Sequence, residues 1–519
     1  MNALDRFINA LAPQWGLARL RARAAAGILQ RHYDAASTGY RTDNWPRRHT
    51  DANAANGPAI ATIRAHARDL HRNNGWAKNG VNVIGRNTVG WGILPKPDTK
   101  NAAVASAVAG LWKEWAASKQ CDADGRSTFY GLQRQVIETV ALSGEALVRM
   151  RPRRLEDGLA IPLQLQVLEP DLIDTTKDGL HTDGGGLIVQ GVEFNAIGKR
   201  VAYWLYDQHP GSTSRAFASR LESRRIPASS VAHIYRTDRP GQVRGISWLH
   251  TAVVGLKDLD EYEDASLVRQ KIAALFSVFV TDPDGTGASF GETDDGDPAI
   301  EQLTPGMIVP LAPGKEVTFA SPPAVVDGGF DERALRKIAA GLGVTYEDLT
   351  GDYSKVNFSS ARLARLAHWA NVHDWRENLL IPQLCDVVWD HAMLLAFVAG
   401  NISETPSATW TPPPMPMIEP DREGLALMRL VRAGAKTPDD MVREQGFDPD
   451  AHWVEYAENL KRLDDLGIVI DSDARKVTQA GLTQKVGGSG KNEEPADDAD
   501  REIDALLLDQ LRSVTGGKQ

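Results

Sequence analysis

The sequence lacks the features of a secreted, membrane-inserted or disulfide-bonded protein. It has only two cysteines among 519 residues, Cys121 and Cys385. Their spacing forms neither a redox pair nor a metal-binding pair, so we expect two free thiols in a reducing cytoplasm. No window approaches 18 consecutive apolar residues, which argues against a transmembrane helix. The N-terminal residues also lack the basic and then apolar pattern of a signal peptide.

Motifs for catalysis or metal binding are also missing. Residues 487–492 resemble a phosphate-binding loop, but Lys485 stands where the first glycine is required and Asn492 replaces the final Ser or Thr. Asp122–Gly125 begins like a calcium loop, yet Gln133 occupies the position that needs a glutamate. Two histidine pairs lie five residues apart, whereas a zinc-binding helix places them four apart: His66 with His71, and His368 with His373. We therefore predict no enzyme activity, no metal ion and no cofactor.

Charge is distributed unevenly along the chain. Residues 1–155 carry 23 Lys and Arg against 11 Asp and Glu, a net charge of +12. Because the whole chain carries −10, the remaining residues carry −22. The basic part either pairs with acidic surface, including that of a neighbouring subunit, or contacts nucleic acid. Arg64, Arg68 and Arg72 lie on one face of a predicted helix and leave the same choice between a solvated face and a nucleic-acid contact.

Hydrophobic periodicity and turn residues predict one α+β domain over about residues 58–244. Helices are expected at three places: 60–83, 102–117 and 128–142. Gly75 and Gly80 weaken the first helix, and Gly144 is expected to end the third. Short strands are expected at five places: 146–150, 163–168, 187–193, 201–206 and 231–235.

The stretch from Gly245 to Gly400 has the pattern of a shaft that subunits could share. It contains, in order, a helix (246–276), a β-rich tip (277–324), a second helix that starts near Phe330 and ends before Gly341, a polar loop (350–357) and a very long helix (359–398). The last helix would span about 60 Å at 1.5 Å per residue. We expect Ser359 to cap it and Pro382 to kink it. Three short helices over 420–466 and a disordered segment over 482–498 complete the expected organisation.

Several segments of the chain resemble a known family. The matching segments are Leu168–Ile173, Gly191–Tyr203, His233–Tyr235 with Gln242–Ser247, Leu349–Ser354 with Asn357–Arg362, and Ile418–Glu423 with Gly434 and Thr437. Together they resemble the lambda-like branch of the portal proteins of tailed bacteriophages, over roughly residues 60–470. The sequence departs from the family pattern at Asn195, where Asp is expected, and at Phe358, where Tyr is expected.

The resemblance implies an α+β portal fold with wing, stem, clip and crown regions and a long kinked helix after a tunnel loop. The implied regions are an N-terminal helix and extended arm (1–57), a wing (58–244), a first stem helix region (245–276), a clip (277–324), a second stem helix region (325–349), a tunnel loop (350–358), the long kinked wing helix with a Pro-rich connector (359–417), a helical crown (418–480) and a disordered acidic tail (481–519).

The resemblance also implies a function and partners. Portal proteins form a dodecameric ring at one capsid vertex, assembled in the host cytoplasm, through which double-stranded DNA is packaged and ejected. The implied partners are other copies of the chain, double-stranded DNA, the terminase large subunit, the head-tail connector, the major capsid protein and the scaffold, with no membrane. Two other classes stay open: a capsid or scaffold component without a channel, and a DNA-processing enzyme.

The tunnel loop is the candidate DNA-contact site. Its residues are Thr350, Gly351, Asp352, Tyr353, Ser354, Lys355, Val356 and Asn357. It holds a single cation, Lys355, opposed by Asp352, and Gly351 gives it conformational freedom. A channel through which DNA slides should bind phosphate weakly, because every strong contact would be a barrier to sliding. We therefore expect this loop to face the channel and touch DNA weakly.

Overall fold

The structure is a computed structural model that describes residues 49–182, 185–213, 222–274, 278–281, 316–319, 329–470, 473 and 475–476. The predicted arm over 1–48, most of the predicted clip and the predicted tail lie outside these residues. The chain divides into two units, Met1–Pro420 and Asp421–Gln519, and each is described by itself.

Four helices begin the described part of the first unit: α3 (Ala52–Asn73), α4 (Gly75–Val89), α5 (Ala102–Ala116) and α6 (Phe129–Ser143). The helix predicted over 60–83 is therefore wrong at both ends. It starts earlier, inside the predicted arm, and it breaks at Asn74. The extended backbone of Asn74 ends α3, while its side-chain oxygen accepts a hydrogen bond from Ala77 N and caps α4. The helix predicted to end at Gly144 does so, with Gly144 in the left-handed conformation.

Two antiparallel sheets follow. The first has the order β3-β2-β9, with β2 at Glu145–Pro152, β3 at Leu163–Leu168 and β9 at Val231–Tyr235. The second has five strands in chain order: β4 (His181–Thr182), β5 (Gly186–Val189), β6 (Val192–Phe194), β7 (Arg200–Tyr206) and β8 (Ser223–Pro227). Apolar side chains from both sheets form one small core: Leu147, Ile173, Val192, Tyr203, Leu205, Val231 and Val243.

The single strand predicted over 187–193 is wrong, because the chain turns back in the middle of it. Gln190 and Gly191 have φ angles of 50° and 81° and form a two-residue turn between β5 and β6. Two consecutive positive φ angles are what a tight hairpin turn requires. The strained Gln190 backbone is held by Asp178, whose carboxylate accepts from Gln190 N at 2.7 Å.

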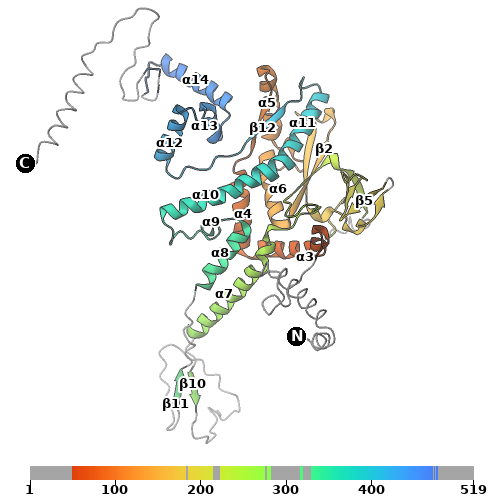
Figure 1. Cartoon of the computed structure of the whole chain (residues 1–519), viewed down its shortest axis with the longest axis vertical. Helices are drawn as coiled ribbons and strands as arrows, with labels where there is room; N and C mark the ends of the chain where they lie inside the picture. Colours follow the sequence, from red (N-terminus) through yellow and green to blue (C-terminus); the bar gives the residue numbers. More distant parts are fainter. Residues whose placement is uncertain are drawn as a thin grey trace, which may run out of the picture. The chain divides into compact units, whose positions relative to one another are not determined.

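A continuous helix of 41 residues, Phe358–Val398, crosses the first unit (Figure 1). It consists of α10 (Phe358–Asp374), a π-helical stretch η9 (Trp375–Cys385) and α11 (Asp386–Val398). Pro382 lies within the π-helical stretch, so the helix departs from α-helical geometry there, and the kink expected at this proline stays a prediction. Arg376 is buried there and donates to Thr88 O, Asn87 O and Pro413 O, so it caps the C-terminal end of α4.

The long helix is a core helix of the first unit. Its second half packs in a cluster of aromatic rings. The centre of the Trp112 ring lies 4.8 Å from that of Trp389 and 5.3 Å from that of Phe129. Among the described residues it is the one helix long and apolar enough to cross a membrane by length and composition alone. Half of its most apolar window is buried inside the protein, as expected for a helix that fills a protein core.

Two helices lead from this core to the predicted clip. Helix α7 (Val253–Ala274) and helix α8 (Phe330–Leu342) pack against one another and lead to a two-stranded antiparallel sheet of β10 (Val278–Thr281) and β11 (Glu316–Phe319) (Figure 1). The predicted helix over 246–276 starts too early, because Ser247 caps the short 3-10 turn Trp248–Thr251 that precedes α7. The predicted end of α8 before Gly341 is also wrong. The helix continues to Leu342, and Gly343 takes the left-handed conformation that ends it.

The remaining elements complete both units. Strand β12 (Ser407–Thr411) pairs with β1 (Leu94–Asp98), so the start of the predicted Pro-rich connector is part of a sheet. Short 3-10 helices lie at Lys119–Cys121, Leu155–Asp157, Pro170–Leu172, Thr175–Lys177 and Ala228–Ser230. The predicted three helices near the C-terminus are found as α12 (Pro420–Arg432), α13 (Pro438–Glu444) and α14 (Pro449–Asp465). Thr437 caps α13 as predicted.

Candidate functional site

The predicted tunnel loop is shorter and more ordered than its sequence suggests. Thr350 ends the short helix α9 (Tyr346–Thr350), so the loop itself comprises residues 351–357. Gly351 has a φ angle of 72° and ends α9 in the left-handed conformation. The predicted cap Ser359 is wrong. Asn357 caps α10 instead: its side-chain oxygen accepts from Ser360 N at 2.8 Å while Ser360 Oγ accepts from Asn357 N.

Local hydrogen bonds hold the middle of the loop. Asp352 accepts from Ser354 N at 2.9 Å, and Thr350 Oγ1 accepts from Asp352 N at 3.1 Å while donating to Tyr346 O. Tyr353 stays 59% exposed. The loop therefore presents an aromatic ring and a lysine from a backbone with a defined shape.

Lys355 reaches out of the loop to helix α8. Its ammonium lies 2.6 Å from Glu332 Oε2, and Arg336 donates to the other carboxylate oxygen of Glu332, also at 2.6 Å. The hydrogen bond and the charge of Glu332 raise the pKa of Lys355, and the hydrogen bond from Lys355 lowers the pKa of Glu332. The sequence prediction that Asp352 is the main opposing charge is therefore incomplete, because the ion pair is made with α8.

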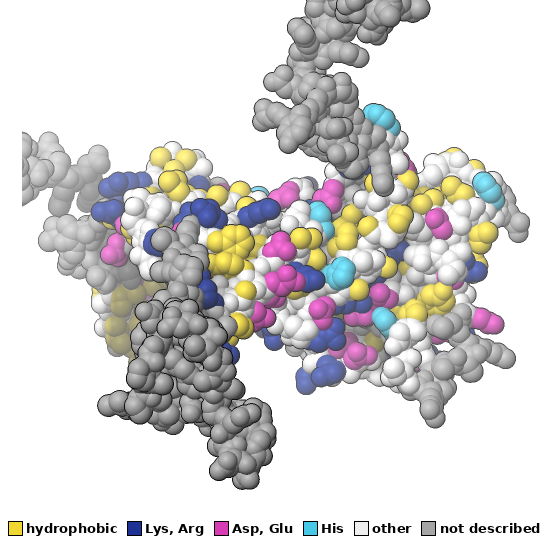
Figure 2. Space-filling model, turned by 90° about the horizontal axis from the view of Figure 1, so that it is seen from below, with side chains coloured by type: hydrophobic (Ala, Val, Ile, Leu, Met, Phe, Trp, Pro, Cys, Tyr) yellow, Lys and Arg dark blue, Asp and Glu magenta, His cyan; other side chains and the backbone are white. Residues whose placement is uncertain are grey.

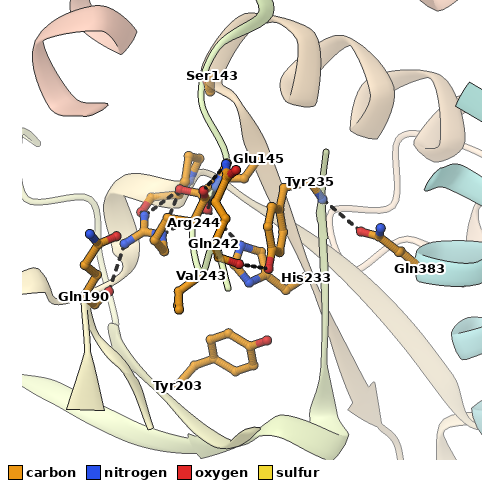
Figure 3. Close-up of polar contacts among 12 residues, drawn as sticks. Ser143, Glu145, Gln190, Tyr203, His233, Tyr235, Gln242, Val243, Arg244 and Gln383 are labelled. Carbon is orange, nitrogen blue, oxygen red and sulfur yellow. Dashed lines mark hydrogen bonds and ion pairs between the residues drawn. The ribbon is translucent and has the colours of Figure 1, made fainter. Parts of the chain in front are cut away.

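A second feature, which sequence reasoning missed, is a buried polar cluster around Glu145 (Figure 3). Glu145 is the first residue of β2 and is fully buried. Its carboxylate accepts hydrogen bonds from Arg64 of α3 at 2.9 Å, from Arg244 at 2.6 Å and from His233 of β9 at 2.8 Å. Gly245 N donates to it as well, at 3.0 Å. The cluster therefore fastens the segment that leads into α7 onto helix α3 and the sheet β3-β2-β9.

The charges in this cluster balance without a charge on His233. Arg64 and Arg244 face the carboxylates of Glu145 and Asp171, the latter 3.4 Å from Arg64 Nη1. Burial lowers the pKa of His233. A neutral ring protonated at Nε2 satisfies both of its contacts, because Nε2 then donates to Glu145 and Nδ1 accepts from the guanidinium of Arg200 at 3.3 Å.

Glu145 stays ionised despite its burial. Burial alone would raise the pKa of Glu145, but the charge of Arg244 and the hydrogen bonds from His233 and Arg244 outweigh burial and hold that pKa well below its usual range. Asp171 behaves in the same way, since Arg64 and Arg68 outweigh the effect of its burial and lower its pKa. The cluster is thus an ionic network inside the protein.

The same position requires two glycines. A Cβ atom on Gly245 would lie 2.1 Å from Gly144 O, and a Cβ atom on Gly144 would lie 2.4 Å from Ile246 C. The backbone that leads toward α7 therefore passes directly against the turn between α6 and β2. This close approach explains the glycine at position 245 of the matching segment Gln242–Ser247.

Two of the three arginines predicted to share one helix face have acidic partners, while Arg72 is exposed. Arg64 is 4% exposed, and Arg68 donates to Asp171 at 2.6 Å. Both interpretations from sequence, a solvated face or a nucleic-acid contact, are therefore wrong for Arg64. On the face shown in Figure 2, Lys and Arg side chains lie among Asp and Glu side chains without forming one continuous basic surface. The first interpretation of the charge asymmetry, pairing with acidic groups, is the one this part of the chain supports.

One group of side chains among the described residues comes close enough to hold a metal ion. The ligand atoms of Glu169, Asp171 and His209 lie within 4.8 Å of one another. The guanidinium of Arg68 is 2.6 Å from Asp171 and 3.5 Å from Glu169, so a cationic side chain already pairs with both carboxylates. Asp122, the start of the apparent calcium loop, instead accepts three backbone hydrogen bonds from its own turn, from Asp124, Arg126 and Ser127.

Comparison with known proteins decides the family. A family model described as "Phage portal protein, lambda family" matches residues 38–376. The chain belongs to the lambda family of phage portal proteins. It is 28% identical over 436 residues to the probable portal protein of Halomonas phage phiHAP-1, covering 78% of this chain and 81% of that protein. It is also 24% identical to portal protein B of Escherichia phage lambda, covering 63% and 67% of the two chains.

Solved structures of gene transfer agent particles show a limited similarity to this portal protein. One, titled as the neck of an empty particle computed with C6 symmetry, gives a TM-score of 0.47 at 16% identity. Another, titled as the virion of a native particle, gives 0.43 at 17%. Each similarity covers 75% of this chain and 94% of the other. The family membership and the α+β class expected from the sequence are both confirmed by the family match and the observed mixture of helices and sheets.

Two of the segments that resemble the family can be explained by contacts in this portal protein. Glu169 and Asp171 of the segment Leu168–Ile173 bind Arg68, and Asp171 also lies against Arg64. Asn195, where Asp was expected, accepts from Lys199 N at 2.8 Å in the turn between β6 and β7. An amide oxygen serves this turn as a carboxylate would, so the departure leaves the hairpin intact.

Proposed function

We propose that this portal protein assembles into a closed ring of twelve copies at one vertex of a phage capsid, and that double-stranded DNA passes through the centre of the ring. The observation that carries the proposal is the α7–α8 pair with its two-stranded sheet. None of residues 261–271 of α7 is buried, and Leu267 and Val268 are 48% and 54% exposed. A helix with so little cover inside its own subunit is well suited to pack against a neighbour in a ring.

The proposed regions are those that the family resemblance implies. Residues 58–244 form the wing, residues 245–276 and 325–349, which contain α7 and α8, form the stem, the segment 277–324 forms the clip and residues 418–480 form the crown. The terminase large subunit docks on the clip during packaging and a head-tail connector replaces it afterwards, while the major capsid protein and scaffold contact the ring from outside. Strands β10 and β11 support a small β tip at the end of the two stem helices. The loop 284–297, for which we propose a docking role, lies outside the described residues.

The loop 351–357 faces the channel in this proposal. Its ordered backbone supports a fixed distance between Lys355 and the channel axis in every subunit, and one cation per copy gives weak contact with the duplex. The protein acts as a conduit and has no catalytic activity of its own, and it is a component of the virion.

Electron microscopy of the purified full-length protein tests the proposal. The expected images are closed rings with a central channel wide enough for a DNA duplex. Mass photometry should give a mass that is a multiple of 56.5 kDa. Shells without a channel would favour a capsid or scaffold component. Magnesium-dependent cleavage of DNA that disappears when this polypeptide is removed would favour an enzyme. Either result would overturn the proposal.

A further inference from the structure

The side chain of Lys355 makes a contact that its own loop cannot supply. Its ammonium is 2.6 Å from Glu332 Oε2, and the two residues lie 23 positions apart, one in the loop and one in the first turn of α8. The lysine is 68% exposed and the glutamate 26% exposed. The loop cation is therefore tied to a stem helix at a site that solvent and a ligand can reach.

Glu332 holds two cations at once. Its other oxygen accepts from Arg336 at 2.6 Å, and the guanidinium of Arg336 lies 5.3 Å from the centre of the Tyr346 ring. The carboxylate of Asp352 is engaged within the loop by Ser354 N. Glu332 is thus the carboxylate that any anion approaching Lys355 must compete with.

The charges in this group sum to zero. Lys355 and Arg336 contribute two positive charges, and Glu332 and Asp352 contribute two negative charges. A phosphate that takes Lys355 must break the ion pair with Glu332 and then lies close to a carboxylate that has lost one partner. Like charges at such short range repel, so the net gain from the contact is small.

We propose that Glu332 is a positioning residue that sets how weakly the loop holds duplex DNA, because it competes with phosphate for Lys355. The inference rests on the proposed channel position of the loop. Passing phosphates displace Glu332 in turn, and the carboxylate recaptures the lysine after each one leaves. The contact then holds the duplex near the axis without becoming a strong barrier to sliding.

The test measures binding of a short mixed-sequence DNA duplex to assembled rings over a series of salt concentrations. Replacing Glu332→Gln should steepen the fall of log K with log salt, by about 0.9 for each lysine that gains a phosphate. Each added contact corresponds to about a three- to fourfold larger loss of affinity between 50 and 200 mM salt. Lys355→Ala in the Glu332→Gln background should remove most of this change.

The matched control is Glu347→Gln. This substitution removes one negative charge, as Glu332→Gln does. Glu347 lies in α9 next to the loop and makes no ion pair with other residues that the structure describes. An equal steepening in Glu347→Gln would show a general charge effect and overturn the inference. No change in Glu332→Gln, together with altered DNA retention in Lys355→Glu, would overturn the inference and leave the channel position of the loop intact. No change in any variant would overturn both.

A second measurement does not need assembled rings. Limited acetylation of the full chain reports how freely the Lys355 amine reacts, with the exposed Lys337 of the same region as internal reference. Loss of the Glu332 hydrogen bond should raise the labelling of Lys355 relative to Lys337, since each unit of pKa changes the free-amine fraction about tenfold. An unchanged ratio in Glu332→Gln would show that the ion pair does not control this lysine and would overturn the inference.

Discussion

The buried cluster around Glu145 makes the sharpest prediction about stability. Replacing Glu145→Gln keeps the shape of the side chain and removes its charge. Arg64 retains Asp171 at 3.4 Å, whereas the described partners left to Arg244 are the carbonyl oxygens of Gln190 and Pro170, at 3.0 and 3.2 Å. The substitution therefore leaves a buried guanidinium without a counter-charge.

The expected loss is about 3–5 kcal/mol of unfolding free energy, the range for breaking a buried ion pair by removing one partner. The amide nitrogen of the new glutamine would also face groups that can only donate, among them Gly245 N and the two arginines. Adding Arg244→Met to Glu145→Gln should recover part of the loss, because the uncompensated charge is then gone.

The assay is chemical denaturation followed by tryptophan fluorescence, at one fixed protomer concentration because assembly shifts apparent stability. The matched control is Glu138→Gln, which breaks the exposed Arg134–Glu138 pair at 2.7 Å on the neighbouring helix. That change should cost less than about 1 kcal/mol. The reasoning about burial fails if Glu145→Gln and Glu138→Gln lower the free energy of unfolding by the same amount.

Three further predictions concern other parts of the chain. Gly245→Ala should lower the free energy of unfolding by about 1–3 kcal/mol, since the new Cβ would lie 2.1 Å from Gly144 O. The control Gly110→Ala, whose Cβ would meet no atom within 4 Å, should be neutral or stabilising in the same denaturation assay. His233 stays neutral in the fold, because burial lowers its pKa, but becomes charged in the unfolded chain below a pH of about 6.5. Lowering the pH from 7 to 5 should therefore cost up to about 2 kcal/mol of unfolding free energy through this residue. His233→Gln should remove that share of the pH dependence, while His181→Gln, an exposed control, should keep it. Leu267→Asp should leave the folded monomer intact and reduce ring assembly in mass photometry, whereas a normal yield of rings would count against packing of the outer part of α7 on a neighbour.

Local signals predicted much of the fold. Thr128 and Gly144 mark the two ends of α6, and Thr437 with Pro438 marks the start of α13, because caps act over a few residues and leave a readable pattern. Strand β9 was predicted at its observed bounds, since its five residues are apolar or aromatic and all are buried.

The candidate sites depend on contacts that no local pattern contains. Glu145 lies 81, 88 and 99 positions from Arg64, His233 and Arg244, and only long-range contacts such as the pairing of β2 with β9 bring them together. The available signal was a glutamate directly after a helix-ending glycine, followed by the apolar residues Ala146, Leu147 and Val148. For the same reason the partner of Lys355 was assigned to the nearby Asp352, although the structure pairs it with Glu332.

Crosslinking from position 355 to packaged DNA tests the central claim most directly. Cys121 and Cys385 are both buried, so a thiol introduced by Lys355→Cys can carry a crosslinker selectively. Ile197→Cys, at a residue that is 86% exposed, is the control. In particles that package DNA normally, we expect crosslinks from position 355 and none from position 197. Particles that package normally and give no crosslink from position 355 would show that the loop does not line the channel.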